Sequence, residues 1–179
     1  MRILHLTQKD YKVGHWSGGS TTELFIWPEG ADYATREFTF RVSSACVEIE
    51  ESDFTPLPGV TRFITPLTGG FVLSHPDGKA VTMAPLDEPY RFSGEMPTHC
   101  VGKAADFNLM LKGVDGSMAI CRDKWSVLPG FNCLYASEET TVHLQQPLTL
   151  QPGELLVVFS QTSRSFAIAG SAIACWAQI

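Results

Sequence analysis

Short stretches of alternating apolar and polar residues recur along the whole chain, and none extends into an amphipathic helix of ordinary length. Turn-forming residues separate these stretches at close spacing, as in the Pro-Asp-Gly-Lys sequence of residues 76–79. A chain made of many short strands must bury their apolar faces in a sandwich or a barrel. The sequence therefore predicts an all-β protein.

Residues 38–45 form the clearest predicted strand. Phe40 and Val42 alternate with Arg41 and Ser43, so one face is apolar and the other carries a guanidinium between hydroxyls. The polar face has two interpretations. It is either an ordinary solvated strand face or the inner wall of a barrel, with Arg41 directed at an anionic ligand.

Composition excludes several classes of protein. With 179 residues, 44% of them hydrophobic and 18% charged, the chain can bury a core and does not resemble a disordered protein. The net charge of -6 and the scattered Lys and Arg residues argue against nucleic-acid binding. No apolar run reaches membrane-spanning length, and the start is too polar for a signal peptide.

The cysteines indicate a cytoplasmic protein. They lack a Cys-x-x-Cys pair and stand mostly in apolar surroundings, which is typical of buried thiols rather than of disulfides or a zinc site. They are Cys46, Cys100, Cys121, Cys133 and Cys175. Near the middle of the chain, residues 112–117 contain Gly113 and Gly116 and form the best candidate boundary between two strand-rich halves.

Metal-binding and nucleophile motifs are absent from the sequence. No two histidines stand at the short spacing of a preformed metal site, and there is no Gly-x-Ser-x-Gly nucleophile motif. His75 is predicted to be a turn residue, and His143 a barrel or surface residue. Carboxylates for acid–base chemistry would be Glu23 and Asp106, of which Asp106 shares a strand face with Asn108.

Ordered sequence pieces over residues 12–110 resemble the HutD/Ves family. Each piece is weak alone, but the set comes in family order. The pieces are Trp-Ser-Gly-Gly-Ser-Thr-Thr-Glu at 16–23, Phe-Arg-Val-Ser-Ser-Ala at 40–45, Leu-Pro-Gly-Val-Thr-Arg at 57–62, Leu-Thr-Gly-Gly at 67–70, Phe-Ser-Gly at 92–94 and Asp-Phe-Asn-Leu-Met at 106–110. The family usually has Asn at Ser17, Gly at Ser20 and Trp at Phe40.

This resemblance implies a metal-free bicupin of RmlC-like double-stranded β-helix (jelly-roll) barrels. Residues 1–112 would form the N-terminal barrel and residues 113–179 the C-terminal barrel half, within one compact unit. HutD proteins are linked to bacterial histidine utilisation and are thought to bind an intermediate such as formylglutamate or urocanate. Carried over residue by residue, the implied ligand-binding residues are Lys12, Trp16, Thr21, Glu23, Arg41, Ser43, Arg62, Asp106 and Asn108.

The resulting hypothesis is a protein that binds a small carboxylate and modulates histidine utilisation without a cofactor and without catalysing a step. Arg41 would hold the carboxylate through two parallel hydrogen bonds, in an apolar cup formed by Phe40, Phe92 and Phe107. One alternative is a metal-independent hydrolase or isomerase with Glu23 or Asp106 as the base. Another is an interaction protein whose barrel is only a scaffold. No nucleic-acid or membrane partner is expected, and a homodimer stays open.

Overall fold

The computed structural model describes residues 1–179, which divide into two compact units. One unit is Lys12–Gly113, and the other combines Met1–Tyr11 with Val114–Ile179. Residues 1–11 therefore lie with the C-terminal unit and not with the N-terminal barrel, because β1 (Arg2–Leu6) pairs antiparallel with β17 (Leu155–Ser160).

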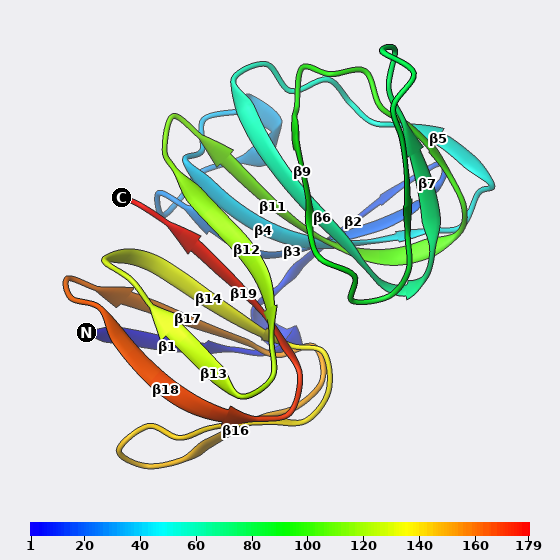
Figure 1. The fold of residues 1–179 in the computed structure, drawn as a ribbon. Helices are drawn as coiled ribbons and strands as arrows, with labels where there is room; N and C mark the ends of the chain where they lie inside the picture. The colour runs from blue at the N-terminus through cyan, green and yellow to red at the C-terminus, as the bar shows by residue number, and fades with distance from the viewer. The chain divides into compact units, whose positions relative to one another are not determined.

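The Lys12–Gly113 unit consists of two sheets, which curve around a common interior (Figure 1). The six-stranded sheet has the order β2-β3-β4-β11-β6-β9, and the four-stranded sheet has the order β5-β10-β7-β8. The strands are β2 (Lys12–Trp16), β3 (Gly19–Trp27), β4 (Phe40–Val47), β5 (Glu51–Asp53), β6 (Val60–Gly69), β7 (Phe71–Ser74), β8 (Ala80–Met83), β9 (Tyr90–Ser93), β10 (His99–Val101) and β11 (Ala104–Lys112).

The second unit also contains two sheets. A five-stranded sheet has the order β1-β17-β14-β19-β12, and a four-stranded sheet has the order β13-β18-β15-β16. The strands not yet given are β12 (Gly116–Cys121), β13 (Lys124–Val127), β14 (Gly130–Ala136), β15 (Thr140–Val142), β16 (Leu148–Leu150), β18 (Arg164–Ala169) and β19 (Ala172–Ala177). Its core includes Trp125, Leu134, Val142 and Leu156.

The predicted all-β class is confirmed. Helical structure is limited to two single-turn 3-10 helices, η1 (Gln8–Asp10) and η2 (Tyr33–Thr35). None of the helices is long and apolar enough to cross a membrane.

Both faces of β4 are buried, which decides between the two interpretations of this strand. Phe40 and Val42 are completely buried, while Arg41 is only 4% exposed and Ser43 only 2% exposed. The solvated-face interpretation is therefore wrong. A polar strand face that is buried in this way belongs to the interior of a barrel, where every donor and acceptor must find a partner.

The interior of the Lys12–Gly113 unit is apolar near the β6–β9 edge of the six-stranded sheet. There Ile64 of β6 and Phe92 of β9 pack with Phe71 and Leu73 of β7 and with Cys100 of β10. This cluster joins the two sheets and fills part of the barrel. The polar residues of β4 and β11 occupy the rest of the interior, as described below.

The two glycines of the β2–β3 hairpin, Gly18 and Gly19, fit tight positions in the fold. A Cβ atom on Gly18 would lie 2.1 Å from the Trp16 ring, so the glycine leaves room for that ring. A Cβ atom on Gly19 would lie 1.9 Å from the carbonyl oxygen of Cys46, and Gly19 has a φ of +149°. Any larger residue at position 19 would force β3 away from β4.

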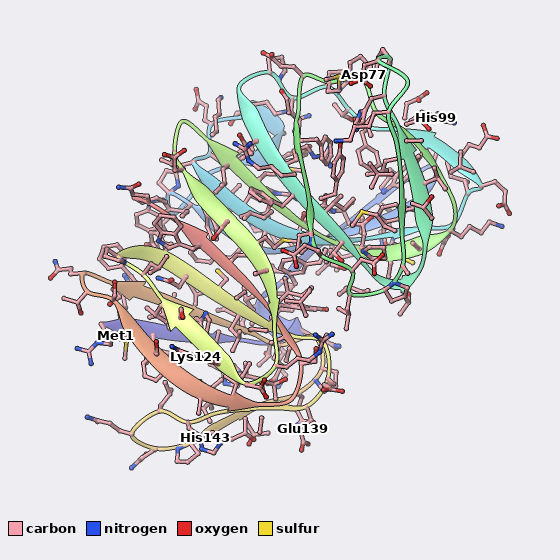
Figure 2. All side chains as sticks on the ribbon, viewed as in Figure 1. Met1, Asp77, His99, Lys124, Glu139 and His143 are labelled. Atoms are coloured by element: carbon pink, nitrogen blue, oxygen red, sulfur yellow. The ribbon has the colours of Figure 1, made fainter.

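Three side chains outside the site test other predictions. His75 is a turn residue, as predicted, because its carbonyl oxygen accepts a hydrogen bond of 3.0 Å from the Gly78 N–H; its ring is buried, and its Nε2 lies 3.0 Å from the Tyr90 hydroxyl oxygen. His143 is at the surface (Figure 2), as one of its two interpretations predicts. Cys46 is exposed, so the prediction of buried thiols is wrong for this residue; burial along its face of β4 decreases from Phe40 and Val42 toward the end of the strand.

Candidate ligand-binding cavity

The Lys12–Gly113 unit contains a cavity of about 570 Å³. Its volume lies within the usual range for sites that bind small molecules. Every residue predicted to bind a ligand lines this cavity: Lys12, Trp16, Thr21, Glu23, Arg41, Ser43, Arg62, Asp106 and Asn108. The structure thus brings all of these residues together around one cavity.

Strand register explains why these residues converge. Lys12, Glu23, Ser43 and Asn108 are directly paired across β2, β3, β4 and β11, so they form one row on the sheet. Side chains that are directly opposite each other on neighbouring strands point to the same face. All four side chains therefore project into the barrel.

Two further rows flank this one. Thr21 and Asp106 both pair with Ala45 of β4. On the other side, Arg41 pairs with Met110, which in turn pairs with Arg62 of β6. The period of two along β4 and β11 thus repeats across the sheet and lines the cavity with polar groups.

Arg41 is already neutralised within the protein. Its Nε donates a hydrogen bond to Oε2 of Glu23 at 2.8 Å, and its Nη1 donates to the Ser43 hydroxyl at 3.0 Å. The guanidinium carbon also lies 4.1 Å from the centre of the Tyr33 ring, within the range of a cation–π contact. Glu23 therefore holds part of the fork that the sequence-based hypothesis reserved for a ligand carboxylate.

Arg62 differs from Arg41 because no carboxylate pairs with it. Its Nη2 donates a long hydrogen bond of 3.3 Å to Oδ1 of Asn108, and its Nε is buried without any hydrogen-bond partner. The guanidinium carbon lies 4.7 Å from the centre of the Phe54 ring and 5.2 Å from that of Phe92. Burial lowers the pKa of Arg62, although a guanidinium keeps its charge at neutral pH.

Asp106 is a buried carboxyl group next to this arginine. Asn108 connects the two, since its Nδ2 donates to Oδ1 of Asp106 while its own Oδ1 accepts from Arg62. Burial raises the pKa of Asp106 to about 7, and the positive charge of Arg62 and the hydrogen bonds from Ala45 and Asn108 counteract only part of this rise. Asp106 therefore loses much of its negative charge near neutral pH.

The charges of the cavity are unequally compensated. Glu23 neutralises Arg41, and Asp53 lies 2.9 Å from Nδ1 of His99 at the surface of the unit (Figure 2). Arg62 and Lys12 have no carboxylate within ion-pair distance. An anionic ligand would supply the missing negative charge.

The apolar lining differs from the predicted cup. Phe40 and Phe107 are completely buried, but they alternate with the cavity-lining residues of β4 and β11 and so lie on the opposite sheet face. For the same reason, the departure from the family residue at Phe40 does not reach the cavity. Of the predicted cup, only Phe92 approaches the site, through its contact with Arg62.

Residues that the sequence analysis did not predict supply the apolar walls: Val13, Tyr33, Val47, Phe54 and Met110. The alternation along β4 and β11 was a usable signal for Val47 and Met110. Tyr33 lies on η2 and Phe54 follows β5, so neither belongs to a periodic pattern that could have identified it. No group of three or more His, Cys, Asp or Glu side chains is arranged to hold a metal ion.

Comparisons with known proteins agree over nearly the whole chain. The family model described as HutD matches residues 8–176. No curated protein sequence matches the chain. HutD from Pseudomonas fluorescens SBW25, in a structure from a formate condition, is similar at a TM-score of 0.84 and 22% identity, covering 99% of this chain and 98% of that chain.

Two further structures extend the likeness. A conserved protein of unknown function from Pseudomonas aeruginosa PAO1 has a TM-score of 0.87 and 23% identity, with 100% of both chains covered. The bacterial pirin YhhW from Escherichia coli, in complex with nickel(II), has a TM-score of 0.66 and 8% identity, with 99% of both chains covered. At these identities the likeness concerns the fold, and it confirms the predicted all-β cupin fold.

Proposed function

The chain belongs to the HutD family, and we propose that it binds a small carboxylate metabolite in the cavity of the Lys12–Gly113 unit. Following the family resemblance, the ligand is an acid of the formylglutamate or urocanate type, and its binding modulates histidine utilisation. The proposal treats the barrel as a sensor or carrier of this acid rather than as an enzyme.

The observation that carries this proposal is the unpaired Arg62. A buried guanidinium without a carboxylate partner is costly, because one long hydrogen bond and two aromatic rings replace only part of its lost hydration and leave its Nε without a partner. A carboxylate fits the planar arrangement of guanidinium donors better than other common anions of its size. The geometry therefore favours Arg62 over Arg41 as the main anchor.

The remaining groups support a ligand that is larger than the carboxylate alone. Lys12 offers a second cation at the exposed strand β2, while Thr21 and Ser43 offer hydroxyls that donate or accept. Trp16, Tyr33 and Phe54 offer apolar surface for the body of the molecule. The site thus suits an acid with one carboxylate at Arg62 and further anionic or polar atoms toward Lys12.

The test is a thermal-shift panel of formylglutamate, urocanate, glutamate and histidine. A compound that binds only the folded protein, at about a hundred times its dissociation constant, adds roughly 2.7 kcal/mol of stability. For a chain of this length we expect the melting temperature to rise by about 5–11 °C. The neutral amide analogue of the best compound should give a much smaller shift, because it brings no charge to Arg62.

Arginine variants locate the site. Arg62→Ala and Arg62→Lys should each lose most of the ligand-induced shift, since neither retains the fork. Arg91→Ala is the matched control, because Arg91 lies on the neighbouring strand β9, is exposed and does not line the cavity. Equal shifts in Arg62→Ala and wild type would remove Arg62 from the site. No shift with any compound would favour the scaffold alternative.

A second candidate function is a metal-independent hydrolase or isomerase that acts on a small carboxylate. The observation that favours it is Asp106, whose pKa of about 7 suits a group that exchanges protons at neutral pH. Glu23 is less suited to be the base because Arg41 occupies its Oε2. Turnover of a panel acid by wild type, abolished in Asp106→Asn, would establish this alternative against simple binding.

A further inference from the structure

Arg62, Asn108 and Asp106 form a buried polar chain along one wall of the cavity. Asn108 bonds to both of the charged residues, and all three side chains are at most 7% exposed. Asp106 itself has no cation within ion-pair distance. The positive charge of Arg62, on the far side of the Asn108 amide, is the main influence that favours the ionised form of Asp106.

An anion bound to Arg62 would remove this support. It would neutralise the guanidinium and place a second negative charge close to Asp106, and two like charges at short range in a buried site are not both retained. The cheapest response is uptake of a proton by Asp106, since the carboxyl can then donate a hydrogen bond instead of repelling the ligand.

We infer that the cavity binds its carboxylate together with one proton, which Asp106 takes up from solvent. This inference rests on the proposed function, because it requires an anion at Arg62. It identifies Asp106 as the residue that determines the net charge of the ligand–site complex. It also implies that the site selects acids whose polar atoms can accept a hydrogen bond from the protonated carboxyl.

The state of Asp106 in the free protein supports this inference. Burial already raises the pKa of this carboxyl to about 7, so Asp106 is about half-ionised at neutral pH. A further rise on ligand binding therefore takes up as much as half a proton at pH 7 and close to a whole proton at pH 8 and above. Below pH 6 the carboxyl is protonated before the ligand arrives, and no proton moves.

Other titratable and charged groups around Asp106 do not offer the same response. Lys12 on β2, Arg41 on β4 and Tyr33 on η2 are the cationic and phenolic groups that also line the cavity. Glu23 on β3 is held by Arg41, and Asp53 on β5 by His99. The Cys100 thiol on β10, which senses the charge of Asp106, has a pKa raised to about 11 by its own burial and therefore stays protonated.

The experiment is isothermal titration calorimetry with formylglutamate at pH 6.0, 7.0 and 8.0, in two buffers of different ionisation enthalpy. The probe has no group that titrates in this range, so the buffer dependence of the binding enthalpy counts protons taken up by the protein. For wild type we expect almost no uptake at pH 6.0 and close to one proton per chain at pH 8.0. The dissociation constant should rise by up to about fivefold between pH 7.0 and pH 8.0.

Asp106→Asn supplies the matched variant, because the amide has the shape of the protonated carboxyl. It should bind formylglutamate without proton uptake, with a dissociation constant that is the same at pH 6.0 and pH 8.0. A proton contributed by His99 would persist in this variant, whereas one taken up by Asp106 would disappear. The proton count on wild type stands without the variant, should Asp106→Asn fold poorly.

The possible results separate the inference from the proposed function. Binding to wild type at pH 8.0 without proton uptake would overturn the inference and leave the proposed function intact. Uptake that persists in Asp106→Asn would overturn it as well, because another group would then carry the proton. If formylglutamate binds neither protein at any pH, the proposed function fails for this acid, and the inference fails with it.

Discussion

Arg41 is a buried partner of Glu23 rather than a free cation, and this changes what its removal should do. On sequence grounds, replacement of a ligand anchor would leave folding almost intact. With Arg41 and Glu23 only 5% and 15% exposed, deletion of one partner leaves the other charge poorly solvated. We therefore predict that Arg41→Ala lowers the free energy of unfolding by about 3 kcal/mol.

Urea denaturation of Arg41→Ala, Glu23→Gln and the Arg41→Ala, Glu23→Gln double variant measures this coupling. The double variant should lose less stability than the sum of the single variants, because neither charge is then left alone. Additive losses would show that the two residues do not act as a pair.

The carboxyl of Asp106 makes stability depend on pH in an unusual direction. Its pKa is raised to about 7 in the folded protein, above the value of about 4 expected in the unfolded chain. The folded protein therefore binds more protons between these values, and its stability falls as the pH rises through this window. One such group accounts for up to about 1.4 kcal/mol per pH unit.

Asp106→Asn should remove this contribution. We expect the variant to gain stability over wild type progressively from pH 4 to pH 7, with the difference constant at higher pH. Chemical denaturation of both proteins at pH 4, 5, 6, 7 and 8 checks the prediction. A difference that is independent of pH would show that Asp106 titrates alike in the folded and the unfolded chain.

Among the elements, the hairpin of β2 and β3 provides a controlled comparison of two glycines. Gly19 has a positive φ and approaches the Cys46 carbonyl, whereas Gly14 on β2 has open space around it. Gly19→Ala should destabilise the protein by about 1–3 kcal/mol through backbone strain and the clash. Gly14→Ala should change stability by less than about 1 kcal/mol. Melting curves of the two variants decide, and similar losses in both would contradict the clash argument.

At the scale of the whole molecule, the fold is shared with a pirin that was crystallised with nickel(II), so metal content is worth measuring directly. No group of three or more potential ligands is arranged for a metal in this chain. We predict less than about 0.1 equivalent of transition metal per purified chain and no loss of stability on treatment with a chelator. About one zinc, iron, nickel or manganese per chain would contradict this prediction.

Much of the fold and of the site membership was predictable because period-two alternation is a local property. Arg41 with Ser43, and Asp106 with Asn108, share a strand face whatever the strand pairs with. Turn signals and the absence of helical periodicity predicted the all-β class for a similar reason. The sequence did not predict that residues 1–11 belong to the C-terminal unit. The pairing of β1 with β17 that places them there joins segments from opposite ends of the chain, which no local pattern reveals.

The sequence by itself determined which side chains stand together on each strand and, through the family resemblance, which residues line the cavity. Only the tertiary structure decided which cation is free. Glu23 reaches Arg41 because β3 lies beside β4 in a particular register, and no carboxylate reaches Arg62 on β6. Ion pairing and burial depend on distances between strands that are far apart in the chain, and barrel closure sets these distances.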